Sequence, residues 1–358
     1  MRRNDTGRFS TLTVATLAAA TVFSAPSIHA QEVHVHGIDS LHVRSNIQGQ
    51  FNTTSVDDEP GSAWEIRRAR IMIRMFAAGW IRADVEGDFG RGNVRLTDGF
   101  VRLDFDPALR VRAGQYKKPF DALVLVSSRE LLVIERDGVP RGSDLPTPYG
   151  LVKGLGYSDR DIGAEWSGHF EPVTLTAGFW NGSGDNEPED DDGKQLGLRA
   201  DVEGPAGWTL SGALAAIRLS APEESDEDGE WQNAVEVAAS YGEYAEPGFK
   251  ALAQLFVGDG EPPDLIEEDE PAFTALHAIV AYHIATWETP YLIGIEPMGR
   301  FGWTDPDTDF DEDEATLWTA GVNLYHHAKV KTQVQIDHVR PAEGESETAA
   351  RVQLALGF

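Results

Sequence analysis

The sequence predicts an all-β protein, a transmembrane antiparallel β-barrel of about sixteen strands. Three observations support this prediction. Apolar and polar residues alternate with a period of two in one segment after another, short and long connections alternate between the segments, and aromatic residues gather near the segment ends. A strand in a barrel wall turns one face to lipid and the other to water, so its residues alternate in this way.

Composition narrows the class of protein. The chain has 358 residues, no cysteine and a formal net charge of -29. Thiolate metal sites, disulfides and cysteine nucleophiles are therefore excluded, and a sequence-independent nucleic-acid surface is not expected. A helical membrane protein is excluded as well, because no apolar run approaches the roughly eighteen residues of a membrane-spanning helix.

Residues 1–30 are predicted to be a cleavable signal peptide. Three arginines open the chain, an apolar stretch follows at 12–23, and residues 28–30 fit a cleavage site. The mature chain, 31–358, is then expected to be a single barrel domain that is exported to the outer membrane.

Eight alternating segments occupy the first part of the mature chain. In the first of them Leu41, Val43 and Ile47 share one parity and Arg44 lies on the other. The polar parity is expected to face the lumen and the apolar parity the lipid. The eight segments are 41–51, 64–76, 81–89, 101–105, 109–116, 160–166, 173–179 and 196–202.

Eight further segments repeat the pattern less cleanly. Pro297 interrupts one of them, since proline cannot donate a ladder hydrogen bond. These segments are 208–217, 231–241, 249–257, 273–284, 291–301, 315–325, 328–339 and 349–358.

The connections are sorted by length. Short turns follow the even-numbered segments, for example at 106–108, 204–207 and 326–327, and long connections follow the odd-numbered ones. Short periplasmic turns and long external loops produce this alternation in outer-membrane barrels, whereas a soluble sandwich has no reason for it.

One long connection, residues 121–159, has an unusual composition. It is far longer than a passive linker needs to be, and it is too apolar for a disordered segment. Its apolar residues include Leu123, Val124, Leu131 and Val133. We therefore expect this third external loop to fold inward and to be enclosed by the barrel.

Several short motifs resemble those of a known family. The motifs are Ile-Arg-Arg-Ala-Arg-Ile at 66–71, Asp-Gly-Phe-Val at 98–101, Gly-Gln-Tyr-Lys-Lys-Pro-Phe at 114–120, Arg-Asp-Ile-Gly at 160–163 and the aromatic-ended Leu-Ala-Leu-Gly-Phe at 354–358. Together they resemble the phosphate-selective porin O/P family. The resemblance implies a homotrimeric outer-membrane porin with sixteen strands, whose inward loop, here 121–159, narrows the channel. Phosphate-selective members carry pore lysines and an arginine ladder, whereas this loop has Lys153 as its single lysine.

Cationic residues gather on the predicted lumen face of the first five segments. They are Arg44, Arg68, Arg70, Arg74, Arg82, Arg102, Arg110 and Arg112, with Lys117 and Lys118 at the root of the long loop. The loop itself carries Arg129, Glu130, Glu135, Arg136, Asp137 and Arg141. Two interpretations remain open. The cations could guide anions along one wall, or they could pair with nearby carboxylates and hold the loop against the wall.

Acidic runs fall in the long connections, at 185–192, 223–230, 267–270 and 305–314. They are either solvated loop charge or carboxylates through which divalent cations bridge the protein to anionic outer-membrane lipid. No metal site or other cofactor is expected, because the His34-Val35-His36 pair lacks a third ligand in sequence.

The sequence therefore predicts an outer-membrane porin for passive diffusion of small hydrophilic solutes, with anions such as phosphate preferred. No nucleophile motif is present, so an enzyme is not expected. Two alternatives remain: an outer-membrane barrel with a hydrolase or adhesion role, and an exported soluble β protein.

Overall fold

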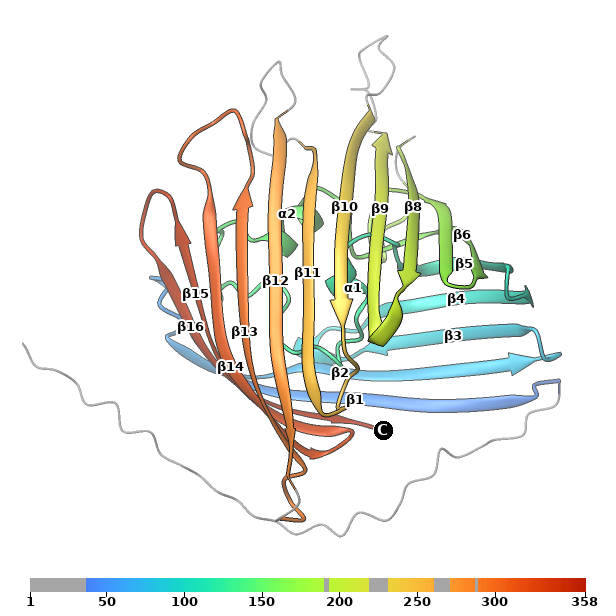
Figure 1. Cartoon of the computed structure of the whole chain (residues 1–358), viewed down its shortest axis with the longest axis horizontal. Coiled ribbons are helices and arrows are strands. Elements are labelled where there is room, and N and C mark those ends of the chain that lie inside the picture. Colours follow the sequence, from blue (N-terminus) through green and yellow to red (C-terminus); the bar gives the residue numbers. More distant parts are fainter. Residues whose placement is uncertain (1–36, 190–192, 219–230, 261–270, 287–288) are drawn as a thin grey trace, which may run out of the picture.

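The computed structural model describes residues 37–189, 193–218, 231–260, 271–286 and 289–358. Sixteen strands within these residues form one closed barrel, in which every strand pairs antiparallel with its sequence neighbours (Figure 1). β1 pairs with β16 and closes the ring. The predicted sixteen-stranded antiparallel barrel is confirmed.

The bounds of the strands agree with the predicted segments to within about four residues, except that β4 begins six residues before its segment 101–105. The first eight strands are β1 (Ser40–Thr53), β2 (Ser62–Ala77), β3 (Ile81–Asp88), β4 (Arg95–Asp106), β5 (Leu109–Lys117), β6 (Arg160–Phe170), β7 (Val173–Trp180) and β8 (Lys194–Glu203). The other eight are β9 (Trp208–Arg218), β10 (Trp231–Tyr241), β11 (Gly248–Asp259), β12 (Ala272–Ala285), β13 (Gly294–Asp305), β14 (Ala315–His327), β15 (Val330–Pro341) and β16 (Glu347–Gly357).

Four short helices lie in the connections. They are η1 (Gly90–Gly92), α1 (Ala122–Leu125), α2 (Pro148–Gly154) and η2 (Pro205–Gly207). α1 and α2 belong to the long connection 121–159. The alternation pattern predicted no secondary structure in this connection. Asp121 caps α1 by accepting hydrogen bonds from the amides of Leu123 and Val124, and Thr147 caps α2.

β13 contains Pro297 and begins three residues later than its predicted segment. Pro297 pairs with Val322 of β14, whereas the ladder between β12 and β13 is interrupted beside it. A residue without an amide proton can occupy a strand at such a break.

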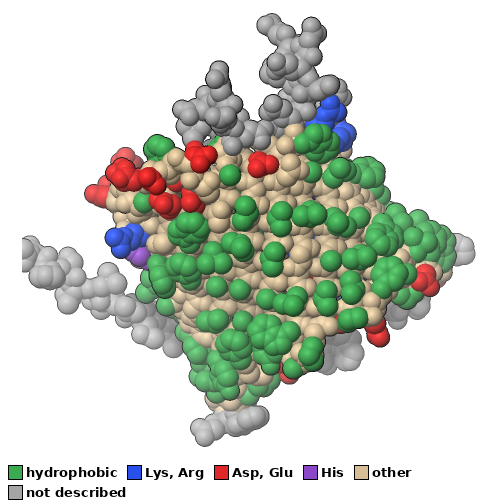
Figure 2. All heavy atoms as spheres, turned by 45° about the horizontal axis from the view of Figure 1, so that its top comes forward, with side chains coloured by type: hydrophobic (Ala, Val, Ile, Leu, Met, Phe, Trp, Pro, Cys, Tyr) green, Lys and Arg blue, Asp and Glu red, His purple; other side chains and the backbone are tan. Residues whose placement is uncertain are grey.

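The two faces of the strands carry different side chains. Ile47, Ile71 and Val101 are exposed on the outside, whereas their inward-facing neighbours Gln48 and Arg70 are buried. Figure 2 shows hydrophobic side chains spread over the outer face, with the largest group of acidic side chains at its upper left edge. The lipid-facing parity is therefore apolar, as predicted.

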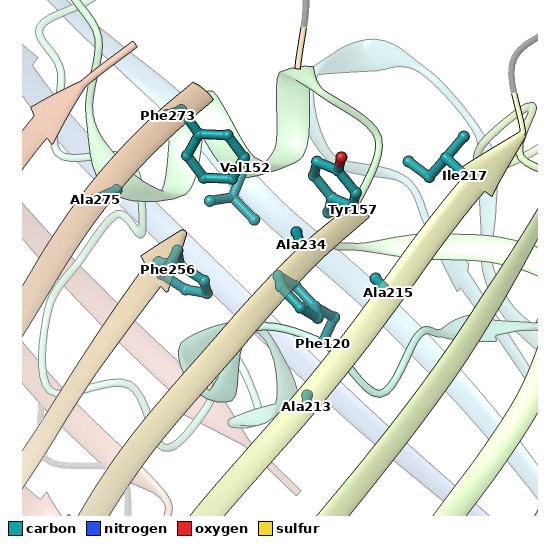
Figure 3. Close-up of a cluster of buried hydrophobic side chains, with 10 residues drawn as sticks. All are labelled: Phe120, Val152, Tyr157, Ala213, Ala215, Ile217, Ala234, Phe256, Phe273 and Ala275. Atoms are coloured by element: carbon teal, nitrogen blue, oxygen red, sulfur yellow. The ribbon is translucent and has the colours of Figure 1, made fainter. Parts of the chain in front are cut away.

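The inner wall of β9–β12 differs from the polar lumen that was predicted. Its inward positions include buried Ala215, Phe256 and Phe273, which pack against Phe120 and Tyr157 beside the long connection (Figure 3). The ring centroids of Phe120 and Phe256 are 5.8 Å apart. Apolar residues face inward here because they pack against a segment of the chain instead of facing water. This packing explains the weaker alternation in the second half of the sequence.

Connection length follows the predicted parity with one irregularity. The connection between β12 and β13, 286–293, is longer than that between β15 and β16, 342–346. The remaining even-numbered strands are followed by shorter connections than the odd-numbered strands beside them.

Candidate pore site

The long connection 121–159 lies against the inner face of the barrel. Figure 1 shows α1 and α2 beside strands β10–β12, and Leu123 and Leu131 pack with Leu252 and Ile279 of these strands. Inward-facing side chains also donate hydrogen bonds to its backbone carbonyls: Gln48 to Ser128, Lys331 to Leu131, Asn323 to Leu132 and Arg300 to Glu135. The segment is thus attached to both sides of the ring, mainly through its backbone and apolar side chains.

The start of the segment is anchored by one carboxylate of the barrel wall. Glu236 of β10 accepts hydrogen bonds from the amides of Asp121 and Ala122, at 2.8 and 2.7 Å. Burial raises the pKa of Asp121 to about 7, and the nearby charge of Glu236 adds to this rise. Asp121 has φ of 68°, so the chain turns sharply as it leaves β5.

Most cations of the β2–β5 wall are paired with carboxylates of β3, β4 and β6. Five ion pairs carry this arrangement: Arg70 to Asp88 at 2.7 Å, Arg74 and Arg82 to Asp84 at 2.7 and 2.5 Å, Arg102 to Asp104 at 2.6 Å and Arg112 to Glu165 at 2.8 Å. Arg112 also lies over the ring of Tyr116, 3.7 Å from its centroid. These pairs hold the guanidinium groups in place and offset much of their charge.

A further ion pair ties the wall to the long connection. Arg67 donates to both carboxylate oxygens of Glu135, at 2.5 and 2.8 Å, and Arg68 lies 3.7 Å from the same carboxylate. Burial alone would raise the pKa of Glu135, but the charges of Arg67 and Arg68 outweigh it and hold the pKa well below its ordinary range.

Arg67 was missing from the predicted set. The β1–β2 register shifts between Gln48 and Gly49, so that Arg67 is an extra residue of β2 at a β-bulge. A signal was present in the sequence: the apolar parity changes between Ile66 and Ala69, which requires one inserted residue between them.

An inner cavity of about 310 Å³ lies between the β1–β6 wall and residues 125–129 of the long connection. Its basic lining residues are Arg44, Arg70, Arg74, Arg112, Lys117, Arg129 and Arg160, and its acidic ones are Glu86 and Asp98. Among the residues that the structure describes, the guanidinium groups of Arg44 and Arg129 have no ion pair or hydrogen bond. Lys117 donates to the carbonyls of Val124 and Val126 rather than to a carboxylate.

Two further cavities are lined by basic residues. An outer cavity of about 540 Å³ lies toward the long connections and is lined by Arg67, Arg68, Arg91 and Arg95 among others. A lower cavity of about 280 Å³ lies toward the short turns and shares Arg44, Asn46 and Arg129 with the inner cavity. Arg68 faces the outer cavity and Arg70 the inner one, so positive side chains line all three.

The family is shown by the sequence. A family model described as phosphate-selective porin O and P matches residues 41–245. The chain belongs to this porin family. The resemblance drawn from the motifs is confirmed, and the outer membrane is the location that the family and the fold indicate. A search of curated proteins found no match.

Solved porin structures share the fold of this porin. An anion-selective porin from Comamonas acidovorans has a TM-score of 0.64 and 12% identity, over 89% of this chain and 99% of the other. Salmonella typhi OmpF in complex with daunomycin has a TM-score of 0.64 and 12% identity, over 92% and 100%. OmpT of Vibrio cholerae in a trimer form has a TM-score of 0.61 and 10% identity, over 89% and 99%. At these identities the likeness concerns the fold alone.

The other predicted site residues of the porin lie at several places. Lys118 is buried, where it donates to the Gly156 carbonyl and to Gln195, and burial lowers its pKa to about 8. Arg136 donates to carbonyls of 123–126, and Arg141 pairs with Glu59 at 2.9 Å near the long connections.

For three predicted residues, no side-chain hydrogen bond or ion pair with another described residue indicates a role. Glu130 lines the lower cavity, and Asp137 lies in the outer cavity, where burial and the charge of Glu135 raise its pKa. Arg110 is half-buried on β5 and forms no ion pair with another described residue.

The described residues hold neither a cluster of metal ligands nor a helix that could span a membrane. They contain no group of three or more His, Asp or Glu side chains that could hold a metal ion. No helix in this part of the chain is long and apolar enough to cross a membrane. The acidic runs 223–230 and 267–270, the end of 185–192, the predicted signal peptide and the His34–His36 pair lie outside the described residues.

Proposed function

We propose that this porin is a passive diffusion channel for small hydrophilic solutes that prefers anions, phosphate among them. The observation that carries the proposal is the pair of guanidinium groups, Arg44 and Arg129, that line the inner cavity without a carboxylate partner. Paired arginines on the β2–β5 wall have much of their charge offset, whereas these two present a net positive charge to any solute in the lumen.

The long connection 121–159 has the role of the constriction in this proposal. Its contacts with both sides of the ring support this role, because they hold it across the lumen and leave the cavities along the β1–β6 wall. Both interpretations of the basic residues then apply, each to a different subset. Arg67 and Arg68 hold the connection in place, and Arg44 and Arg129 act on the solute.

The remaining parts of the proposal follow from the family. We infer export by a signal peptide at 1–30 and assembly as a homotrimer, since a porin of the same fold forms a trimer. Acidic residues such as Asp305 and Asp313 would face outward at the external side, where divalent cations could bridge them to anionic lipid. The proposal assigns no catalytic role to the protein.

Ion selectivity in a planar bilayer tests the proposal. The reversal potential in a KCl gradient should show chloride preference for the wild type, and this preference should fall markedly in the double variant Arg44→Gln with Arg129→Gln. Arg91→Gln is the matched control, because Arg91 is an exposed arginine paired with Glu65 at 2.9 Å near the long connections. Cation preference in the wild type, or unchanged selectivity in the double variant, would refute the proposal.

A further inference from the structure

The inner cavity has an apolar side as well as a cationic one. Leu125 at the end of α1 is 37% exposed, whereas the other large hydrophobic side chains of the described segment 121–159 are buried or half-buried. Met72 lines the same cavity from β2, at an inward position between Arg70 and Arg74. Phe100 lines it from β4. These side chains face the lumen, where the membrane cannot cover them.

An exposed leucine inside a water-filled channel needs a physical reason. Elsewhere along 121–159 the large apolar side chains are covered by the barrel wall, as Leu123 and Leu131 are. Leu125 is turned instead toward the cavity that Arg44 and Arg129 line. The cavity, about 310 Å³, is large enough for a small organic molecule.

We propose that the inner cavity binds organic anions that join a carboxylate to a short hydrocarbon part. The carboxylate lies at Arg44 and Arg129, and the hydrocarbon part lies on Leu125, Met72 and the edge of Phe100. This inference rests on the proposed anion preference and specifies its substrate class. Inorganic phosphate uses the guanidinium groups alone and leaves the apolar side in contact with water.

The size of the effect follows from apolar burial. A fully buried methylene strengthens binding roughly fourfold. Because Leu125 remains partly exposed, about twofold for each added methylene is expected here. Between acetate and hexanoate, which differ by four methylenes, affinity should therefore rise by about one order of magnitude.

Current block in single channels measures this affinity. The full-length mature porin is placed in a planar bilayer, and the concentration of acetate, butyrate, hexanoate or phosphate that halves the chloride current is determined. Leu125→Asn keeps the branched shape and the number of side-chain heavy atoms and removes the apolar surface. Leu145→Asn is the matched control, since Leu145 lies in the same segment and lines the outer cavity.

The outcomes separate this inference from the proposed function. We expect hexanoate to block at about tenfold lower concentration than acetate, this difference to become markedly smaller in Leu125→Asn, and phosphate block to be the same in both channels. Equal block by acetate and hexanoate in the wild type overturns the inference, even if Leu125→Asn does not fold, and leaves anion preference intact. Absence of block by all four anions overturns the proposed function together with the inference.

Discussion

The ion pair between Arg67 and Glu135 makes the attachment of the long connection testable. Glu135→Gln leaves Arg67 and Arg68 without their carboxylate: Arg68 keeps its hydrogen bond to Gln48, and Arg67 stays at the β-bulge. Removing one partner of a buried pair costs about 3–5 kcal/mol. The side chains of Arg67 and Glu135 are 15% and 7% exposed, so solvent screens them in part and we expect about 3 kcal/mol.

That loss should change how often the connection leaves the wall. Because 1.4 kcal/mol corresponds to a tenfold change, the detached population should rise by about a hundredfold. The Ile134 amide donates to the side chain of Gln335 at 2.8 Å, next to the ion pair, so its hydrogen-exchange rate reports the detachment. The same variant should show more frequent current fluctuations in a planar bilayer.

Two comparisons make the experiment decisive. Glu65→Gln removes the partner of Arg91 in a more exposed pair and should leave Ile134 exchange unchanged. In the wild type the attachment should persist between pH 7 and pH 5. The pKa of Glu135 is held below its ordinary range, so its contribution is present above the unfolded pKa and is lost only as pH falls through the lower folded pKa. Ile134 exchange that rises less than twofold in Glu135→Gln would refute the reasoning.

Three other predictions concern the packing of the same segment and wall. Phe256→Ala should cost about 3 kcal/mol, because it removes the buried ring that packs on Phe120; thermal unfolding and single-channel conductance should show a less stable and wider channel. Burial raises the pKa of Asp121 to about 7, so the folded state binds the proton more tightly than the unfolded state does. Wild-type stability should therefore fall as pH rises from about 4 to about 7, and Asp121→Asn should abolish this dependence. Thermal unfolding at several pH values measures it. Gly178→Val should prevent a heat-modifiable barrel on gels, since a Cβ there would lie 2.6 Å from the Ala164 carbonyl oxygen and 2.7 Å from Trp180, and a folded variant of wild-type stability would contradict this.

The sequence alone determined the architecture. The period-two alternation predicted the number of strands, their approximate bounds and the face that each turns to lipid, because these properties depend on residues that are neighbours in the chain. Apolar residues in an overlong connection, such as Leu123 and Leu131, predicted that this connection would be enclosed. The motifs between 66 and 163 were sufficient for the family.

Only the tertiary structure decided which basic residues are available to a solute. Arg44 and Arg70 have the same parity and the same chemistry in the sequence, yet Arg70 is paired with Asp88 and Arg44 is not. Pairing depends on register between strands and on a segment that returns from 60 or more residues away, as with Arg67 and Glu135, which are 68 positions apart. Local alternation carries no information on such contacts. For the same reason the apolar inner wall of β9–β12 was visible only once the segment that covers it was in place.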